Sequence, residues 1–270
     1  MNVKQKNIFI TGAASGIGKA TALYFANKGW AVGLFDINEK GLEKVAQEIG
    51  HNSCMYQKLD VTNNSDWNSA REAFSEYTGG TCDLFFNNAG IANFTGRLED
   101  IPIQESQKII NVNFNGVVNG IYAILPLLKK TNKSVIVNTS SVGGFVPVPG
   151  AAIYSATKFA VRGLTEALSI EFDKYGVAVC EVNPWFTDTP ILDAEQITPR
   201  MDGAFNRDKI NQISKIYPPK KVAEVVFSIY RKKQVHNKVG WESKFYTFIM
   251  NYFPSVIRRF SRNMYKKDFD

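Results

Sequence analysis

Short apolar segments alternate along this chain with longer segments in which apolar residues recur every three or four positions. The short runs are typical of buried strands, and the longer spacing is typical of helices that bury one face. The short runs cover residues 6–12, 30–36, 53–61, 82–90, 134–141 and 177–185. Helical spacing covers residues 16–29, 38–50, 63–77, 101–130, 154–175 and 218–233, with a break expected near residues 113–116.

This alternation predicts a parallel sheet that is covered by helices on both faces. Right-handed crossovers then give an α/β, doubly wound Rossmann fold. No linker and no internal repeat interrupts the alternation, so we expect one domain. Residues 1–240 would form its dinucleotide-binding and catalytic body, and residues 241–270 a helical C-terminal extension of the same domain.

The extension combines aromatic and basic residues at helical spacing. Pro254 is expected to break or restart its helix, and Arg258, Arg259 and Arg262 stand among the apolar residues. Such a helix suits a membrane interface, and packing against the body or a sister subunit is the more ordinary alternative. The apolar positions are 245, 248, 249, 252, 253, 256, 257, 260 and 264.

The positive charge of the protein is concentrated in the same part of the chain. The formal net charge is +7, with a sequence pI of about 9.2. Residues 220–270 hold 12 Lys/Arg and 4 Asp/Glu, whereas the other residues hold 20 and 21. The body is therefore nearly neutral, which argues against nucleic acid as a partner.

The rare residue types restrict the class of protein further. Cys54, Cys82 and Cys180 are scattered without a CxxC pair, which indicates reduced thiols that fill the core of a cytoplasmic protein. The first residues do not form a signal peptide, and no segment reaches the ~20 apolar residues of a membrane span. With two histidines, His51 and His236, we expect no metal site.

The first candidate site is the glycine-rich segment TGAASGIG, residues 11–18, between the first predicted strand and helix. Glycines let the backbone approach a pyrophosphate, and the N–H groups of the helix start stabilise its charge. Many strand-to-helix turns need glycine for geometry alone, but the strand–turn–helix context favours dinucleotide binding. The expected contacts are Gly12, Ser15, Gly16, Ile17 and Gly18.

Asp36 ends the second predicted strand and is the candidate for cofactor selection. A carboxylate at this place accepts hydrogen bonds from the adenosine ribose and repels a 2′-phosphate. Neither the glycine segment nor Ile37 offers a cation, so we expect NAD rather than NADP. The alternative is an acid that merely stabilises the next helix N-terminus.

Two later strand ends add polar or small residues. Asp60 and Val61 end the third strand, where an acid can reach the adenine amino group or cap the next helix. Residues 87–90, NNAG, end the fourth strand and would let the backbone pass close to a ligand. From this loop we expect contacts by Asn87, Ala89 and Gly90.

The strongest chemical signal is YSATK, residues 154–158. Lys158 lies one helical turn from Tyr154, so its ammonium can favour the phenolate and lower a pKa that is about 10 in water. Ser141 lies at the end of the fifth strand, and Ser140 is its neighbouring alternative. Each residue alone has an ordinary explanation in packing or solvation, but the three together indicate a proton-transfer site at the carboxyl edge of the sheet.

These motifs, TGAASGIG, LDV, NNAG, the asparagine of VNFNG, the serine of NTSS and YSATK, resemble the short-chain dehydrogenase/reductase family in identity and order. The resemblance covers nearly all of residues 6–190. It implies Tyr154 as general acid/base, Lys158 as the residue that lowers its pKa and binds the nicotinamide ribose, and Ser141 as the residue that orients the substrate oxygen. It implies that Asn113 holds a water in a proton relay.

One segment departs from the family pattern. The resemblance implies nicotinamide contacts after the sixth strand by Pro184, Thr187 and Thr189. Here the segment reads NPWFTDTP, with Trp185 at a usual glycine and Thr187 at a usual aliphatic residue. A tryptophan does not freely adopt glycine's backbone angles, so it would line the substrate pocket or cover the sheet edge.

The sequence thus predicts an NAD-dependent oxidoreductase that interconverts a secondary alcohol, lipophilic if the extension faces a membrane, and its carbonyl. Residues 190–217 would form a lid over this small-molecule substrate. The family resemblance implies a homo-oligomer, either a dimer or a tetramer. The alternative function is a non-catalytic NAD(H)-binding sensor or scaffold, which would have no need of Tyr154 and Ser141.

Overall fold

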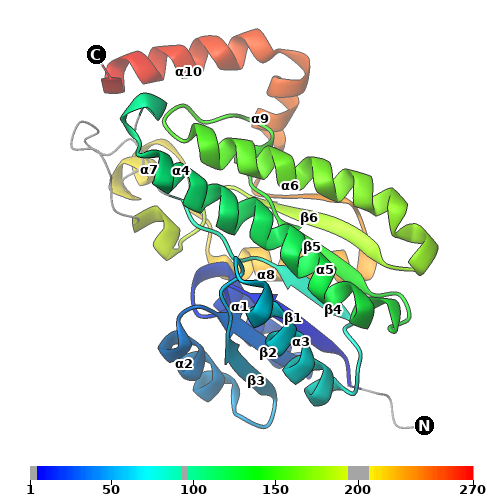
Figure 1. Ribbon diagram of the computed structural model, residues 1–270. Helices are drawn as coiled ribbons and strands as arrows, with labels where there is room; N and C mark the ends of the chain where they lie inside the picture. The colour runs from blue at the N-terminus through cyan, green and yellow to red at the C-terminus, as the bar shows by residue number, and fades with distance from the viewer. Residues whose placement is uncertain (1–4, 93–96, 194–206, 270) are drawn as a thin grey trace.

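The protein folds around one seven-stranded parallel sheet, as the alternating sequence pattern predicts (Figure 1). The computed structural model describes residues 5–92, 97–193 and 207–269. The strand order is β3-β2-β1-β4-β5-β6-β7, the doubly wound order of a Rossmann fold with one strand added at an edge. The strands are β1 (Asn7–Thr11), β2 (Ala31–Asp36), β3 (Cys54–Lys58), β4 (Leu84–Asn87), β5 (Val135–Thr139), β6 (Ala178–Pro184) and β7 (His236–Val239).

Helices connect the strands and cover both faces of the sheet (Figure 1). Apart from one short helix within the predicted lid segment, each helix of the body begins and ends within four residues of the segment that the apolar spacing predicts. Up to β6 these are α1 (Gly16–Ala26), α2 (Glu39–Ile49), α3 (Asn64–Thr78), α4 (Ile103–Ile110), α5 (Gly116–Lys129) and α6 (Ala152–Glu171). After β6 follow α7 (Arg207–Ile213), α8 (Pro219–Lys232), α9 (Trp241–Tyr252) and α10 (Pro254–Phe269).

The two faces of the sheet bury different kinds of side chain. Aliphatic residues such as Ile8 and Ile10 of β1 pack with Phe25 of α1 and Val226 of α8 on one face. The other face is aromatic, with Phe9 stacked on Phe35 at 3.8 Å between ring centroids. Because neighbouring strand residues point to opposite faces, each apolar strand contributes to both cores.

The strand β7 was not predicted from sequence. His236–Val239 reads HNKV, a mostly polar segment without the apolar run that marks the other strands. It forms because β6 offers an unpaired parallel edge, with Glu181 opposite His236 and Pro184 opposite Val239. Backbone pairing at an edge depends on hydrogen bonds more than on buried side chains.

The long helix predicted over residues 101–130 is interrupted where the sequence indicated. Between α4 and α5, residues Asn111–Asn115 form one π-helical turn. Such a turn inserts an extra residue into a helix and re-aims the side chains beside it. Here it directs Asn113 into the protein, where this side chain is fully buried.

The C-terminal extension consists of α9 and α10, and Pro254 restarts the helix as expected. α10 (red in Figure 1) lies at the end of the molecule farthest from β3 and α2. The apolar positions 260 and 264 lie outside the residues whose side chains are described. Within the described ranges, no helix is long and apolar enough to cross a bilayer.

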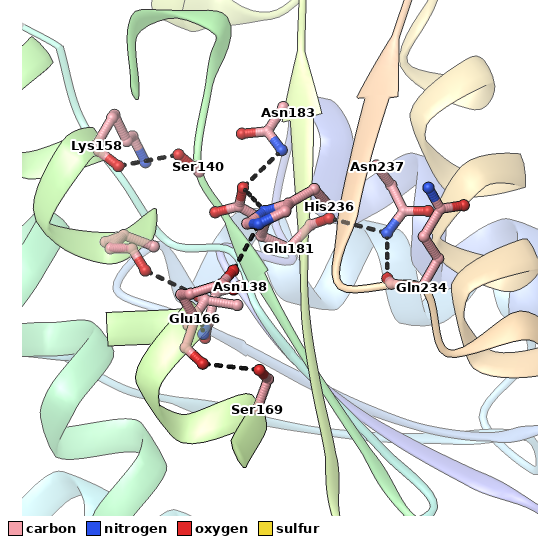
Figure 2. Close-up of polar contacts among 12 residues, drawn as sticks. Asn138, Ser140, Lys158, Glu166, Ser169, Glu181, Asn183, Gln234, His236 and Asn237 are labelled. Carbon is pink, nitrogen blue, oxygen red and sulfur yellow. Dashed lines mark hydrogen bonds and ion pairs between the residues drawn. The ribbon is translucent and has the colours of Figure 1, made fainter. Parts of the chain in front are cut away.

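A polar row crosses the aromatic face between β5, β6, β7 and α6 (Figure 2). Register places Asn138 beside Glu181, and Glu181 beside His236. His236 contacts the buried Glu181 through Nδ1 at 2.7 Å and Glu166 of α6 through Nε2 at 2.6 Å. Asn183 donates to the same Glu181 oxygen at 3.0 Å.

The three cysteines are buried free thiols, as predicted.

Candidate active site

The glycine segment forms a tight turn at the carboxyl end of β1. Gly12 has φ +67° and Gly16 has φ +50°, angles that residues with a side chain rarely adopt. A Cβ on Gly18 would lie 1.9 Å from the Gly12 carbonyl oxygen, so no side chain fits there. Ser15 is the exposed N-cap of α1, and Ile17 packs toward the core. The first N–H groups of α1 have no partner within the helix, and they face the glycine turn from which the helix starts.

Asp36 stands beside this turn at the end of β2. Its carboxylate accepts the Ala14 N–H at 3.0 Å and the Asn38 N–H at 2.9 Å. One oxygen thus holds the glycine turn and the other holds the start of α2. Ile37 beside it is 61% exposed and offers an apolar surface at the sheet edge. The carboxylate is therefore fixed in place at the position the sequence predicted for ribose binding.

Ser140 and Ser141 point in different directions, which separates the two serine candidates. The Ser140 hydroxyl is buried and donates to the Lys158 carbonyl at 3.0 Å, so it ties β5 to α6. The Ser141 oxygen accepts the Gly143 N–H at 3.1 Å and forms a hydrogen bond with the Tyr154 phenol. The bond from Gly143 uses a lone pair of the Ser141 oxygen and not its proton. The hydroxyl can therefore donate that proton to the phenol or to a substrate oxygen.

Lys158 is almost completely buried beside Tyr154. Its ammonium donates to the Thr139 carbonyl at 2.9 Å and lies 5.6 Å from the Tyr154 ring centroid. Burial lowers the pKa of Lys158 to about 8. The lysine is therefore no solvated surface charge, and it holds its proton only weakly for a lysine.

The direction of the Tyr154 pKa differs from the sequence prediction. Burial raises the pKa of Tyr154, and the Ser141 hydrogen bond lowers it by less. Lys158 is not among the causes of this shift, so the lowering that the sequence predicts from the lysine stays a prediction. The physical reason for the raised pKa is that a buried phenolate loses its hydration, which disfavours the charged form.

Asn113 holds the loop that follows β4. Its amide donates to the Ile91 carbonyl and accepts the Ile91 N–H, both at 2.8 Å. A Cβ on Gly90 would lie 3.3 Å from the Asn113 oxygen and 3.6 Å from Lys158 Nζ. The NNAG loop thus passes close to both residues. The water relay predicted for Asn113 remains a prediction, because its amide atoms are bonded to Ile91.

The structure reveals three connecting residues that the sequence reasoning did not select. Asn88 donates to the Thr11 carbonyl at 3.0 Å and accepts the Thr139 hydroxyl at 3.2 Å. The Thr11 hydroxyl accepts the N–H groups of Asn88 and Ala89 at 2.9 and 3.0 Å. These contacts join the loops after β1, β4 and β5. The signal was present, since Thr11 and Asn88 lie inside the motifs already identified.

Three predicted cofactor residues use their polar groups elsewhere. The Asn87 amide is buried and donates to the Val117 carbonyl of α5 at 2.9 Å. Asp60 accepts the Thr62 N–H and hydroxyl at 2.9 and 2.7 Å, which forms a local turn before α3. Val61 is buried, and its carbonyl accepts the Trp67 indole N–H at 2.9 Å. Their cofactor contacts stay predictions, and these bonds hold the shape of the loops in which the three residues lie.

The segment after β6 reaches the glycine turn. A Cβ on Gly16 would lie 2.9 Å from the Thr189 methyl, so Thr189 stands at the turn. The Thr187 hydroxyl donates to the Trp185 carbonyl at 2.8 Å, and Pro184 is the buried last residue of β6. Part of the predicted lid, residues 194–206, lies outside the described residues.

Trp185 occupies its position without backbone strain. Positive φ angles at non-glycine residues in the described chain occur at Lys133 and Lys233, so Trp185 has ordinary angles. Its indole donates to Ser214 at 2.7 Å and stacks on Tyr246 of α9 at 5.2 Å between centroids. The tryptophan therefore joins the site to the residue that follows α7 and to the C-terminal extension.

Together these residues give the carboxyl edge of the sheet two functions. The glycines with positive φ and the first N–H groups of α1 make a cradle that side chains would fill, which fits a dinucleotide pyrophosphate. At the carboxyl end of β5 and the start of α6, Ser141, Tyr154 and Lys158 form a group that can donate and accept protons. Across the described residues, no cluster of His, Cys, Asp or Glu could hold a metal ion.

Comparison with known proteins identifies the family. A family model described as short chain dehydrogenase matches residues 6–199. An uncharacterised oxidoreductase from Listeria monocytogenes is 40% identical over 198 residues, 72% of this chain and 79% of the relative. Cyclohexanol dehydrogenase from an Acinetobacter strain is 33% identical over 227 residues, 82% of this chain and 86% of that enzyme.

A solved structure agrees over nearly the whole chain. A short chain dehydrogenase/reductase from Burkholderia phymatum in complex with NAD matches with a TM-score of 0.82 and 25% identity, over 95% of this chain and 96% of that one. The fold is thus that of the Rossmann-type, nucleotide-binding α/β proteins. More particularly, this chain belongs to the short chain dehydrogenase family. The enzyme class predicted from sequence, an NAD(P)-dependent oxidoreductase acting on CH–OH groups, is confirmed.

Proposed function

We propose that this enzyme uses NAD to oxidise a secondary, lipophilic alcohol to its ketone, or catalyses the reverse reduction. The observation that carries the proposal is the Ser141–Tyr154–Lys158 group at the carboxyl edge of the sheet, next to the glycine cradle. When bound in the cradle, NAD supplies the acceptor for the hydride. The proton is the part of the reaction that falls to the chain's own residues.

Tyr154 takes the proton of the alcohol during oxidation and returns it during reduction. Ser141 is suited to hold the substrate oxygen, since its own oxygen is fixed by the Gly143 N–H and its proton is available. Lys158, held by the Thr139 carbonyl, places a positive charge beside the phenol without contact with bulk water. A charge in such a dry site acts more strongly on a developing alkoxide than it would in solution.

The preference for NAD rests on Asp36. Two backbone N–H groups hold its carboxylate at the end of β2, so it cannot easily turn away from a cofactor ribose. A 2′-phosphate placed there would meet a fixed negative charge. The lipophilic substrate is supported by the aromatic group of Trp185, Phe186 and Tyr246 beside the site. The cyclohexanol dehydrogenase relative is consistent with such a substrate class.

The proposal extends to the quaternary state and the location of the enzyme. Ile103 and Ile110 of α4 are 62% and 38% exposed, an apolar surface that a second copy would cover. We therefore propose a dimer or tetramer in the cytoplasm, where the three free thiols stay reduced. Light scattering of the purified protein measures the assembly, and a monomeric mass would contradict it.

The test of the proposed function follows NADH absorbance with a panel of secondary alcohols, from short aliphatic to cyclic and polycyclic ones. We expect Tyr154→Phe to lower kcat by about a thousandfold and Ser141→Ala by about a hundredfold. Ser140→Ala is the matched control, because that hydroxyl bonds the α6 backbone and not the phenol. It should lose stability and keep most of its kcat.

Three results would contradict parts of the proposal. Turnover chiefly with NADP would reject the role of Asp36. A Tyr154→Phe variant as active as wild type would reject the proton transfer. Binding of NAD, measured by tryptophan fluorescence, without turnover of any alcohol or ketone in the panel would favour a sensor over an enzyme.

A further inference from the structure

Helix α9 is built in the opposite sense to an ordinary surface helix. Its buried residues are Glu242, Ser243 and Thr247, which are small or polar. Its exposed residues include the large aromatic ones, with Trp241 65% and Tyr252 68% exposed. A helix on a globular protein usually buries its apolar side and exposes its polar side.

The aromatic side chains form one continuous stripe. Trp241, Phe245, Phe248 and Tyr252 follow one another at intervals of four, three and four residues, which places them on one side of α9. Each is at least 50% exposed. At the junction with α10 the stripe continues into Phe253 and Val256, which are 53% and 56% exposed. An exposed apolar surface of this kind marks a binding face.

The polar side of α9 explains why the helix keeps this orientation. Glu242 is buried and accepts the Tyr217 hydroxyl at 2.8 Å. The Ser243 hydroxyl contacts the Asn183 carbonyl of β6 at 3.5 Å, and Tyr246 stacks on Trp185. These contacts fix the inward side, so the helix cannot rotate its aromatic stripe into the core.

The charges around the stripe are all of one sign. Among the described side chains of residues 241–263, the exposed charged ones are Lys244, Arg258, Arg259 and Arg262. Glu242 is the acidic residue of that segment, and it is buried. The face therefore presents aromatic groups together with positive charge.

We propose that α9 and the start of α10 dock on an anionic membrane surface. Aromatic rings bury well at the boundary between headgroups and acyl chains, and arginine and lysine pair with anionic headgroups. Charge complementarity selects this occupant over a second copy of the chain. Two copies meeting face to face through this surface would bring the same cations together, with no exposed acid in the segment to pair them.

The position of the face gives it a function for catalysis, which rests on the proposed dehydrogenase activity. Tyr246 links α9 directly to Trp185, the residue after β6 at the candidate site. A docked enzyme would thus hold the substrate side of its active edge near the bilayer. The substrates that gain most are alcohols and ketones dissolved in the lipid.

The test is co-sedimentation of the full chain with vesicles. We expect binding to phosphatidylcholine vesicles that contain about one third phosphatidylglycerol, and at least about tenfold weaker binding to pure phosphatidylcholine. The double variant Trp241→Ala/Phe248→Ala should lose most of this binding. The variant Arg258→Glu/Arg259→Glu should lose this binding as well. Added salt should weaken the binding of wild type to anionic vesicles.

Tyr122→Ala is the matched control, because Tyr122 of α5 is an exposed aromatic residue, 78% accessible, outside the face. It should bind vesicles as the wild type does. Absence of binding to anionic vesicles, or an equal loss in Tyr122→Ala, would overturn the proposal. A wild-type assembly that the double variant dissociates in light scattering would assign the face to a second copy instead.

A failure of the vesicle test can be distinguished from a failure of the proposed function. Vesicle binding requires no turnover, and turnover of a water-soluble alcohol requires no vesicle. We expect the double variant to oxidise a soluble alcohol at the wild-type rate. A lipid-dissolved alcohol should react about tenfold more slowly with that variant than with wild type when vesicles are anionic.

Discussion

At the scale of single residues, Lys158 is the most unusual side chain of the site. It is a buried lysine whose ammonium contacts the Thr139 carbonyl, and burial lowers its pKa to about 8. A charge in such surroundings costs stability, so packing alone does not explain a lysine here. This cost is what we expect of a residue retained for its chemistry.

The cost of Lys158 should depend on pH. Its folded pKa is about 8 and its ordinary value is 10.5, so the folded state releases the proton first. The penalty is complete below pH 8 and fades as the pH rises toward 10.5. From pH 7 to pH 9.5, we expect the free energy of unfolding of wild type to improve relative to Lys158→Met by about 2 kcal/mol.

Urea unfolding at both pH values measures this difference. Lys44→Met serves as the control, because Lys44 is an exposed lysine of α2. Its difference from wild type should be the same at both pH values. A Lys158→Met difference that also stays constant would mean that this lysine does not titrate early.

At the scale of elements, the π turn between α4 and α5 connects the fold to the site. An extra residue in a helix is costly unless surrounding contacts hold it. Here the inserted turn directs Asn113 to both polar groups of Ile91, just beyond the NNAG loop. The turn therefore fixes the loop that runs beside Lys158.

Removal of this amide should loosen the loop. Asn113→Ala leaves the Ile91 N–H and carbonyl without a side-chain partner, which we expect to cost about 2 kcal/mol. In a chain of this size that lowers Tm by about 5 °C. The cofactor KM should rise, because the loop lies against the glycine turn. Calorimetry and initial rates measure the two effects.

Asn115→Ala is the matched control within the same turn. The Asn115 amide is exposed and bonds Asn111 on the surface at 2.9 Å. Its Tm and cofactor KM should stay close to those of wild type. Equal losses in the two variants would show that the turn, and not the bond to Ile91, is what matters.

At the scale of the whole molecule, one histidine joins three elements. His236 of the edge strand β7 contacts Glu181 of β6 and Glu166 of α6 (Figure 2). The hydrogen bond to Glu181 raises the pKa of His236 above 6.5, the charges of both glutamates add to this, and partial burial opposes it. Lys238 of β7 also interacts with Glu181: burial and the charge of Arg162 lower the pKa of Lys238, and the charge of Glu181 raises it.

The stabilisation by His236 should be lost as the pH rises. A raised folded pKa means that the folded state binds the proton more tightly than the unfolded chain does. The contribution is complete below the unfolded value of about 6.5 and disappears as the pH passes through the higher folded value. We expect Tm to fall over this window by about 2–4 °C, the shift that about 1 kcal/mol produces.

The second histidine of the chain, His51, provides the control for this measurement. His51 is exposed in the turn before β3, so His51→Gln should follow the wild-type profile of Tm against pH. His236→Gln should start lower at pH 6 and stay flat through the window. A wild-type slope that persists in His236→Gln would place the titrating group elsewhere.

Much of this arrangement was predictable from sequence because the physical causes are local. Apolar runs and helical spacing predicted six of the strands and the helices between them, since buried elements need those patterns. The glycines of residues 11–18 predicted a turn that side chains cannot enter. The same motifs that resemble the family contain Ser141, Tyr154 and Lys158, which the fold brings to one edge of the sheet.

Other features follow from contacts between distant parts of the chain. β7 forms on a free sheet edge, although HNKV carries no strand pattern of its own. The Asn87 amide faces α5 and the neighbouring Asn88 joins the loops, a difference of one residue that strand register decides. Desolvation sets the direction of the Tyr154 pKa, and it depends on everything packed around the phenol.

The sequence by itself determined the order of elements, the family and the residues able to carry chemistry, because these depend on residue type and spacing. The tertiary structure alone decided which serine meets the phenol, which asparagine joins the loops and which side of α9 faces outward. The apolar spacing of residues 245–257 would have fitted an inward aromatic side equally well. Glu242, Ser243 and Tyr246 turned it outward, because their partners lie far away in the sequence, on β6 and the segments next to it.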